Sequence, residues 1–357
     1  MHKDHYSDAK WFAKEIDSIF HNEWMCVARN EELCNVGDYK IINLLGESVI
    51  ILKSEDSQLR AFINLCKHRG CQLLDSEGET STGNLGINIR CPYHSWTYNF
   101  RGKLIKAPHL DIDLNDKQYH LNDIQIQLWG GCVFISLNAN ISSLENHLKG
   151  RIEQFSRYPL DDLISKSRLS YEVNANWKVI LENYNECYHC AGVHPELCNI
   201  VPAFRKNGGA DLNWEEGVPQ KKGTNTYTFS GTTNREPFPG LNEFEKERHF
   251  GQAIYPNLLI SFSMDHVALF ILHPLSESKT IIDFHILFHP SAIANKNFNP
   301  DDALSFWDLT NKQDWSICER VQRGMQSKTF TKGFYGKMED ENLDVRQYIT
   351  DKLNLNN

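Results

Sequence analysis

The sequence lacks several features that would each assign it to a class of protein. Basic residues are outnumbered, with 37 Lys and Arg against 46 Asp and Glu and a net charge of −9, which argues against a nucleic-acid-binding surface. Long apolar runs are missing as well, because the longest, Val267–Leu272, is far too short to span a bilayer. The opening residues are polar, without the apolar core of a signal peptide. We therefore expect a soluble, cytoplasmic protein.

The chain also lacks the cysteine density of a disulfide scaffold. Ten cysteines in 357 residues, without a secretory signal, are expected to be thiols and metal ligands rather than a disulfide framework. The chain has no internal repeat and no low-complexity tract. Its 41% hydrophobic and 23% charged residues are ordinary for a globular protein, and its length predicts about two domains.

The hydrophobic pattern divides the chain into three parts and predicts an α+β protein. Apolar residues at helical spacing predict an opening helix over Asp8–Trp24, followed by short β-rich runs that form an all-β domain over residues 25–138. Residues 139–357 are expected to form an antiparallel sheet with helices, and residues 1–24 to pack on it. The clearest elements there are strands over Val267–Pro274 and Thr280–Pro290 and helices over Trp177–His194 and Asp301–Gln326.

The first part contains two short ligand motifs. Cys66 and His68 are one residue apart, and Cys91 and His94 are two residues apart. Two thiolates and two imidazoles suit a two-iron, two-sulfur cluster in which the cysteines hold one iron and the histidines hold the other. The same ligand types also suit zinc, although zinc fingers usually pair cysteine with cysteine and histidine with histidine.

A second group of ligands follows in the helix predicted over Trp177–His194. Glu182, Glu186 and His189 would form one stripe of that helix, and His194 would lie near its last turn. Such a stripe alone is typical of an ordinary solvated helix face. Two histidines and one carboxylate, however, are the ligands of an open ferrous iron site that leaves positions for dioxygen and substrate.

The carboxylate that completes this site is predicted from the final long helix. Asp314 is the only acid on its apolar stripe, whereas Asp308 and Glu319 lie well away from it. The other residues of the stripe are Trp307, Cys318, Val321 and Met325. A metal ion is a natural partner for a buried carboxylate, and an arginine or a buried water is the alternative.

A competing hypothesis uses the two cysteines in the same predicted helix. Cys187 and Cys190 with His189 and His194 could form a zinc or redox site. A Cys-x-x-Cys pair is typical of thioredoxin-like proteins only near a βαβ pattern, which this sequence lacks. Cys187 is also expected on the apolar side of the helix.

The first pair of motifs resembles the Rieske iron–sulfur motif, over Cys66–Gly70 and Cys91–Trp96. Rieske proteins of respiratory complexes add a disulfide between these loops, for which Cys71 could supply one half, but Tyr93 stands in the matching place. The resemblance is therefore to the oxygenase and ferredoxin branch, and Cys71 is expected to be a buried thiol. The 22 residues between His68 and Cys91 exceed the usual spacing, which indicates a lengthened polar hairpin over Glu77–Gly86.

The run from Asn176 to His194, together with Gln313–Trp315, resembles the catalytic motif of Rieske non-haem iron oxygenase α-subunits. The resemblance implies a Rieske 2Fe-2S domain and a helix-grip catalytic domain. It also implies a homotrimer with electron transfer between subunits, and a separate NAD(P)H-dependent flavin or ferredoxin reductase, since the chain has no dinucleotide fingerprint. The implied ligands are Cys66, His68, Cys91 and His94 for the cluster and His189, His194 and Asp314 for Fe²⁺, with Glu186 and Asn183 as catalytic residues and Glu186 as the bridge between the centres.

The position of Glu186 narrows the resemblance further. Aromatic-ring dioxygenases carry Asp there, whereas the segment Glu186–Cys190 is similar to the branch that acts on carnitine, glycine betaine and related quaternary ammonium compounds. The expected reaction is hydroxylation next to nitrogen, followed by N-demethylation. The alternatives are hydroxylation or O-demethylation of an aromatic acid and, in another class, electron transfer without oxygenase activity. Candidates for an aromatic cage around a cationic head are Tyr227, Phe229, Phe250, Phe262 and Phe270.

Overall fold

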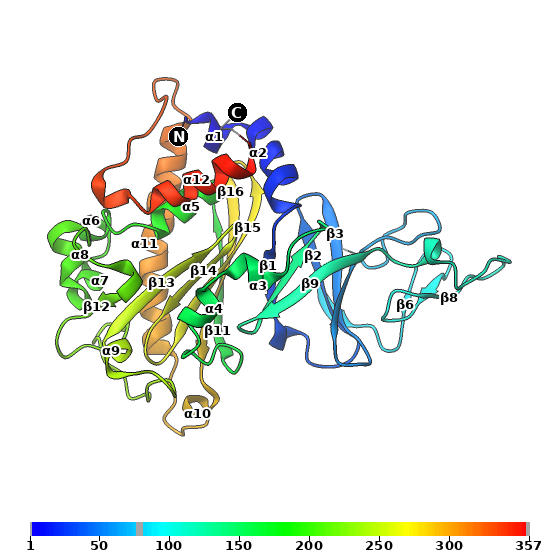
Figure 1. Ribbon diagram of the computed structural model, residues 1–357, viewed down its shortest axis with the longest axis horizontal. Helices are drawn as coiled ribbons and strands as arrows, with labels where there is room; N and C mark the ends of the chain where they lie inside the picture. The colour runs from blue at the N-terminus through cyan, green and yellow to red at the C-terminus, as the bar shows by residue number, and fades with distance from the viewer. Residues whose placement is uncertain (1, 76–80, 355–357) are drawn as a thin grey trace. The chain divides into compact units, whose positions relative to one another are not determined.

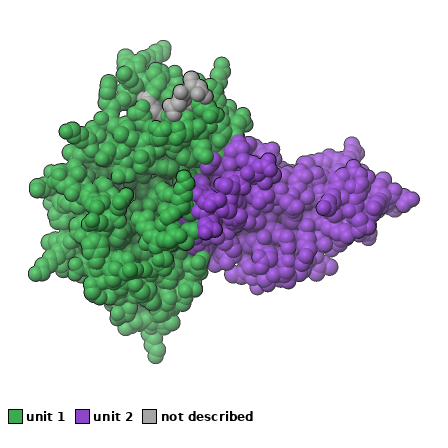
Figure 2. Space-filling view, viewed as in Figure 1, with its two compact units in different colours: residues 1–19, 148–357 green, residues 20–147 purple. Residues whose placement is uncertain are grey.

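The computed structural model describes residues 2–75 and 81–354 (Figure 1). The chain folds into two compact units (Figure 2). One comprises residues 20–147, and the other comprises residues 1–19 together with residues 148–357. No helix in the described ranges is long and apolar enough to cross a membrane.

The unit over residues 20–147 is built from antiparallel strands, as the sequence predicts. Its larger sheet has the order β1-β10-β9-β4-β3-β2-β5. The bounds are β1 Met25–Arg29, β2 Asp38–Leu44, β3 Glu47–Lys53, β4 Leu59–Ile63, β5 Thr82–Asn84, β9 Asp123–Trp129 and β10 Cys132–Ser136. The β-branched and leucine run at residues 49–52 suits the interior position of β3, between β4 and β2, and all four side chains are buried.

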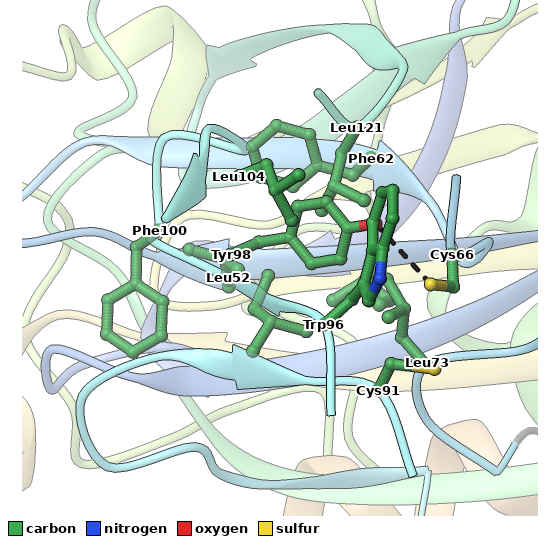
Figure 3. Close-up of a cluster of buried hydrophobic side chains, with 12 residues drawn as sticks. Leu52, Phe62, Cys66, Leu73, Cys91, Trp96, Tyr98, Phe100, Leu104 and Leu121 are labelled. Atoms are coloured by element: carbon green, nitrogen blue, oxygen red, sulfur yellow. Dashed lines mark hydrogen bonds between the residues drawn. The ribbon is translucent and has the colours of Figure 1, made fainter. Parts of the chain in front are cut away.

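A second, smaller sheet in the same unit has the order β6-β7-β8. Its strands are β6 Ile89–Arg90, β7 Thr97–Tyr98 and β8 Leu104–Lys106. Buried side chains between the two sheets, among them Phe62, Tyr98 and Phe100, form the core that Figure 3 shows around Cys66 and Cys91. The two predicted cluster motifs therefore border a packed apolar core, which fixes their backbone.

The other unit contains a six-stranded antiparallel sheet of order β11-β16-β15-β14-β13-β12. Its strands are β11 Ile164–Val173, β12 Val218–Pro219, β13 Arg248–Ile254, β14 Leu258–Phe262, β15 Val267–Ser276 and β16 Lys279–Phe288. The strands predicted over Val267–Pro274 and Thr280–Pro290 are thus confirmed. The alternation in β16 predicts His285 on the polar face, but its side chain is buried and its Nδ1 lies 2.9 Å from the Ser165 hydroxyl.

One long helix, α11 Asp301–Met325, packs against this sheet and confirms the predicted helix almost to the residue. The Trp307 indole lies 6.0 Å and 6.3 Å from the rings of Phe270 and Phe284, which are side chains of β15 and β16. The predicted stripe is wrong at Val321, which is exposed, because Gln322 takes the buried place. Gln322 is tolerated there because its amide donates to Tyr6 O and accepts from Asn176 N.

The continuous helix predicted over Trp177–His194 is wrong. Helix α5 ends at Tyr184, and two short helices follow, α6 Cys190–Val193 and α7 Pro195–Ile200. The carboxylate of Glu186 accepts the N–H groups of Tyr188 and His189, which makes a turn in place of helical hydrogen bonds. The stripe argument for Glu182, Glu186 and His189 therefore does not hold, although the turn still brings the ligands together.

The remaining α-helices are shorter, and α3 falls almost wholly within the unit over residues 20–147. They are α1 Asp4–Ser7, α2 Ala9–Glu15, α3 Leu144–Leu148, α4 Arg151–Gln154, α8 Pro202–Asn207, α9 Glu243–Lys246, α10 Pro290–Ile293 and α12 Asn342–Lys352. The opening helix predicted over Asp8–Trp24 is realised as α2 and a π-helical turn over Ile16–Phe20, and α1 precedes it. A buried ion pair between Glu15 and Lys178, at 2.6 Å, joins α2 to α5.

Candidate metal centres

The two predicted cluster motifs lie on loops of matching backbone geometry. The peptide nitrogens of Cys66 and Cys91 each donate to the carbonyl five residues further on, at 2.8 Å in both loops. Gly70 and Ser95 donate back to the two cysteine carbonyls, at 3.0 and 3.1 Å, and both have positive φ values of 71° and 60°. Glycine adopts this backbone without strain, and Ser95 adopts it at a cost that the loop hydrogen bonds offset. Each loop therefore presents its cysteine and histidine in a similar way.

The side chains of the four predicted cluster ligands come together at the ends of these loops. Cys66 and Cys91 are buried, and the rings of His68 and His94 lie 4.7 Å apart. The His68 ring stacks on the Trp96 indole at 4.9 Å, which fixes its plane. The structure thus brings the thiolates to the inside and the imidazoles to the outside, an arrangement that suits a cluster with one iron facing the protein and one facing outward.

The environment of Cys66 favours a metal-bound thiolate. Burial raises the pKa of the Cys66 thiol, while the Tyr98 hydroxyl, 3.4 Å from its sulfur, lowers it in part (Figure 3). A thiolate at such a buried position needs a cation beside it, and ligated iron supplies one. The neighbouring Cys71 was expected to be buried, but its side chain is half-exposed and its sulfur lies 3.2 Å from the Gln72 carbonyl oxygen.

The lengthened hairpin predicted over Glu77–Gly86 falls partly outside the described residues, which leave out residues 76–80. Within the described part, Thr82–Asn84 is strand β5, which pairs antiparallel with β2.

The three predicted ligands of the lone iron converge. His194 Nε2 lies 2.8 Å from Asp314 Oδ1, and His189 Nε2 lies 3.2 Å from both of these atoms. Three ligands on one octahedral face, each about 2.1 Å from a metal and at right angles, are about 3.0 Å apart. The observed triangle has that size, although the ligands come from α11 and from two separate turns.

The outer nitrogens of both histidines are held by acceptors. His189 Nδ1 lies 2.7 Å from Glu186 Oε1, and His194 Nδ1 lies 2.7 Å from Gln313 Oε1. Each Nδ1 therefore carries a proton, so both Nε2 lone pairs face the Asp314 carboxylate. Three acceptor atoms in contact need a cation between them, and this is the fit expected of a metal site. No sequence pattern indicated this role for Gln313, although it stands next to the predicted ligand.

The ionisation of the site supports the same conclusion. Burial by itself lowers the pKa of His189, but the hydrogen bonds and charges of Asp314 and Glu186 outweigh it and raise the pKa to about 10. Burial raises the pKa of Asp314, yet its two histidine partners hold it below its usual range. The three side chains therefore stabilise a positive charge at this point, a proton in the metal-free chain or a metal ion in the loaded one.

The other residues of the second motif differ in whether their side chains reach the three converging ligands. Asn183 Nδ2 lies 3.4 Å from His189 Nε2, so this predicted catalytic residue is at the centre. Glu182 is directed elsewhere, since its Oε1 accepts the hydroxyls of Tyr6 and Tyr335, both at 2.6 Å. Cys187 and Cys190 form a disulfide, which corrects the expectation that the cysteines are all thiols or ligands.

A cavity of about 880 Å³ opens onto the three converging ligands. Among the five aromatic residues predicted for a cage, Tyr227 is the one that lines it. Phe229 is exposed, and Phe262 and Phe270 pack in the core against Phe155 and Phe284. Phe250 packs near Tyr158. Sequence spacing could not distinguish pocket walls from core because both are apolar positions on the same strands.

The cavity wall also has aromatic side chains that were not predicted for a cage, among them His249 and Trp307. His249 stacks on Tyr227 with the ring centres 3.9 Å apart, and Trp307 lies 5.7 Å from Tyr227. Burial lowers the pKa of His249 to about 3, so its imidazole is neutral. We call Tyr227, His249 and Trp307 the aromatic wall.

A buried polar chain holds the Trp307 indole in place. Trp307 Nε1 donates to His266 Nε2 at 2.9 Å, and His266 Nδ1 lies 3.1 Å from Asp265 Oδ1. Because an indole N–H is only a donor, His266 Nε2 must be the acceptor and Nδ1 must carry the proton. Arg235 Nε completes the chain by donating to Asp265 Oδ2 at 2.7 Å.

Comparison with known proteins identifies both units. Residues 23–118 match the Rieske [2Fe-2S] domain, and residues 160–354 match the ring hydroxylating alpha subunit (catalytic domain). The glycine betaine monooxygenase oxygenase subunit of Pseudomonas aeruginosa (strain UCBPP-PA14) is 28% identical, over 93% of this chain and 83% of that protein. The carnitine monooxygenase oxygenase subunit of Escherichia coli (strain K12) is also 28% identical, over 91% and 84%.

Solved structures agree with these relatives. The quaternary ammonium Rieske monooxygenase CntA, in complex with an inhibitor, matches with a TM-score of 0.77 at 25% identity, over 99% of this chain and 94% of that one. Naphthalene 1,2-dioxygenase with indole bound, at 17% identity and a TM-score of 0.71 over 99% and 92%, shares the fold. The predicted α+β fold, with a Rieske domain and a catalytic domain, is therefore confirmed, as are its cofactors, a Rieske 2Fe-2S cluster and a mononuclear iron. The catalytic-domain match alone covers more than half of the chain, and the protein belongs to the ring-hydroxylating oxygenase α-subunit family as a Rieske non-haem iron oxygenase.

Proposed function

We propose that this chain is the terminal oxygenase component that hydroxylates a carbon next to the nitrogen of a small quaternary ammonium compound of the betaine or carnitine type. The resulting carbinolamine collapses to an amine and an aldehyde, so the net reaction is N-dealkylation. The observation that carries the proposal is the aromatic wall, which lines the same cavity as the three converging ligands His189, His194 and Asp314. The glycine betaine and carnitine monooxygenase relatives support the same class of substrate.

We assign the ligands as the sequence predicts them. Cys66, His68, Cys91 and His94 would hold the cluster, and the three converging side chains would hold the mononuclear iron. When bound, the iron supplies dioxygen activation, and the cluster supplies electrons one at a time. The chain is proposed to divide into an N-terminal helix over residues 1–24, a Rieske domain over 25–138 and a catalytic domain over 139–357. The Glu15–Lys178 ion pair supports placing the first helix with the catalytic domain.

Aromatic rings attract a trimethylammonium head through their electron-rich faces. His249 adds a neutral ring at this point, so the wall carries no positive charge that would repel the head. Carboxylates of Glu186, Glu341 and Asp344 also line the cavity and favour a cation. Lys149 and Arg151 also belong to the lining and offer partners for the carboxylate of a zwitterionic substrate.

Glu186 and Asn183 are the proposed catalytic residues. Glu186 holds His189 Nδ1 and two peptide N–H groups, so it orients an iron ligand as well as lying on the proposed route from the cluster. Asn183 presents an amide that can hydrogen-bond to a group at the centre. Electrons are proposed to come from a separate NAD(P)H-dependent reductase, and to cross from the cluster of one subunit to the iron of another in a homotrimer. Inter-subunit electron transfer in a quaternary ammonium Rieske monooxygenase of similar structure supports this route.

The decisive experiment measures substrate-dependent oxygen and NADH consumption with a surrogate reductase. The panel contains glycine betaine, γ-butyrobetaine, carnitine, choline and an aromatic acid, with 3,3-dimethylbutyrate as a neutral-headed analogue of a betaine. We expect aldehyde release in step with oxygen uptake for at least one quaternary ammonium compound and none for the neutral analogue. Turnover of the aromatic acid alone would overturn the proposed substrate class.

Variants separate the assigned roles. His189→Ala should leave the cluster absorption intact and abolish turnover. At saturating ferrous iron, Glu186→Ala should also abolish turnover while both metals remain bound, because it removes the acceptor of His189 Nδ1 but none of the three proposed ligands. Loss of the mononuclear iron in Glu186→Ala would make Glu186 necessary for iron binding rather than for electron transfer.

A further inference from the structure

A disulfide borders the proposed iron centre. Cys187 and Cys190 are joined with their Cα atoms 4.9 Å apart, and they enclose Tyr188 and His189 in the turn between α5 and α6. The other eight cysteines are free thiols. The one disulfide among the ten cysteines, all of which are described, is therefore the one that contains an iron ligand in its loop.

The sulfur of Cys190 is directed toward the centre. It lies 3.9 Å from His189 Nε2. The Cys190 sulfur and one ring nitrogen each of His189 and His194 all lie within 4.8 Å of one another. In the disulfide this sulfur carries no charge and is not a ligand, because metals bind the thiolate. Asp314 therefore remains the third ligand, at a shorter distance. What Cys190 adds to the centre is an oxidisable atom beside the proposed site of dioxygen chemistry.

Both cysteines can be reached from the cavity. Cys187 and Cys190 line it together with the three ligands. Cys187 is half-exposed, whereas Cys190 is only 2% exposed. A small oxidant in the cavity therefore meets Cys187 more readily, and Cys190 stands within disulfide distance to complete the reaction.

We propose that Cys187 and Cys190 form a dithiol–disulfide pair that consumes peroxide produced at the iron centre. Hydrogen peroxide is the two-electron, two-proton reduction product of dioxygen, and an oxygenase releases it when electrons are not delivered to substrate. The Cys187 thiolate attacks one peroxide oxygen, which gives a sulfenic acid and the first water. The Cys190 thiol then attacks that sulfur, forming the S–S bond and releasing the second water. A small dithiol, or a protein dithiol of the thioredoxin class, returns two electrons and two protons and leaves as its own disulfide.

The pair would protect the turn that carries His189. The two sulfur atoms line the same cavity as the His189 ring and offer peroxide a reaction that a cellular dithiol can reverse, in place of oxidation of the ring. This inference depends on the proposed function only for the source of the peroxide. The reactivity of the two cysteines can therefore be tested without any oxygenase activity.

The first experiment uses the full-length protein with its cluster retained, its mononuclear iron removed and its disulfide reduced, and adds one equivalent of hydrogen peroxide. Isotopically distinct alkylation before and after reduction, followed by mass spectrometry, measures the oxidation of each cysteine. We expect Cys187–Cys190 to oxidise at least tenfold faster than Cys34, an exposed thiol that serves as the internal reference. Cys34→Ser is the matched control and should leave this rate unchanged. Oxidation of the pair no faster than Cys34 would overturn the proposal.

The second experiment supplies iron, reductase and NADH without substrate. The disulfide should form at the rate of peroxide production, and Cys190→Ser should instead accumulate over-oxidised Cys187 and several-fold more oxidised His189. A pair that stays reduced during this turnover would also overturn the proposal. Failure of the proposed substrate class would leave both results unchanged, because neither experiment contains a substrate.

Discussion

Gln313 gives the sharpest prediction about the iron centre, because one hydrogen bond links its side chain to a proposed ligand. Its Oε1 accepts the His194 Nδ1 proton at 2.7 Å, and the His194 ring is almost fully buried. Gln313→Leu removes this acceptor while keeping the side-chain size. The buried N–H then has no partner, and the ring can move its proton to Nε2 and donate to Asp314, which competes with the metal.

The expected loss follows from two independent magnitudes. Removing an acceptor that orients a metal-binding histidine weakens metal binding by about 10- to 100-fold, or about 1.4 to 2.7 kcal/mol. A buried donor left unsatisfied costs about 1 to 3 kcal/mol. The two ranges overlap, so Gln313→Leu should bind ferrous iron about 10- to 100-fold more weakly. Gln313→Glu keeps an acceptor for His194 but loses the hydrogen bond from Gln313 Nε2 to Glu196 Oε2 at 3.2 Å, so it should bind iron more tightly than Gln313→Leu.

The assay is anaerobic competition for Fe²⁺ with a coloured chelator, with cluster absorption as the measure of intact folding. Ser316→Ala, at an exposed position of the same helix, is the matched control and should not change iron affinity. If Gln313→Leu binds iron within twofold of the natural chain, the hydrogen bond does not set the His194 tautomer and the reasoning is refuted.

Three further predictions concern ionisable groups. The pKa of His189 is about 10 in the metal-free chain, so a metal must displace its proton, and the affinity for Co²⁺ should rise about tenfold per pH unit from about pH 6.5 to 8.5. Competition with a chelator measures this affinity, and Glu186→Gln should make it depend less steeply on pH. Burial holds His249 neutral in the folded chain, with its pKa lowered to about 3. Below about pH 6 the unfolded chain therefore binds one more proton than the folded chain, and the free energy of unfolding decreases by up to about 1.4 kcal/mol for each unit by which the pH is lowered. His249→Phe should lessen the acid dependence of urea unfolding by that amount, and an unchanged dependence would contradict it. Lys178→Met leaves the buried Glu15 carboxylate unpaired and should cost about 3 to 5 kcal/mol in urea unfolding, whereas adding Glu15→Gln should recover most of the loss.

Local sequence was sufficient wherever a short motif sets its own geometry. The cluster loops are an example, because Cys66 and Cys91 each lie at the start of a turn whose hydrogen bonds close within five residues. Strong periodicity likewise predicted β15, β16 and α11, since each buries one continuous apolar face. The choice of Asp314 over Asp308 and Glu319 also came from the periodicity of α11, and the structure places Asp314 beside both histidines.

Periodicity failed where a side chain competes with the helix for backbone hydrogen bonds. Helical spacing over residues 177–194 gave no sign that the Glu186 carboxylate would accept two peptide N–H groups and end α5 at Tyr184. The predicted stripe was therefore wrong while the ligand set it supported still came together. The prediction that Val321 is buried was wrong for a related reason, because the contacts of Gln322 with the N-terminal segment decide which face of α11 is buried.

The sequence by itself determined the order of the domains and indicated the two proposed sets of metal-binding side chains, because ligand chemistry and short-range spacing are properties of the chain. Only the tertiary structure decided which residues complete each site. Gln313, the aromatic wall and the Cys187–Cys190 disulfide depend on atoms that meet across turns, strands and helices far apart in the chain. Contacts of this kind are set by the packing of whole elements, which no local pattern of residues contains.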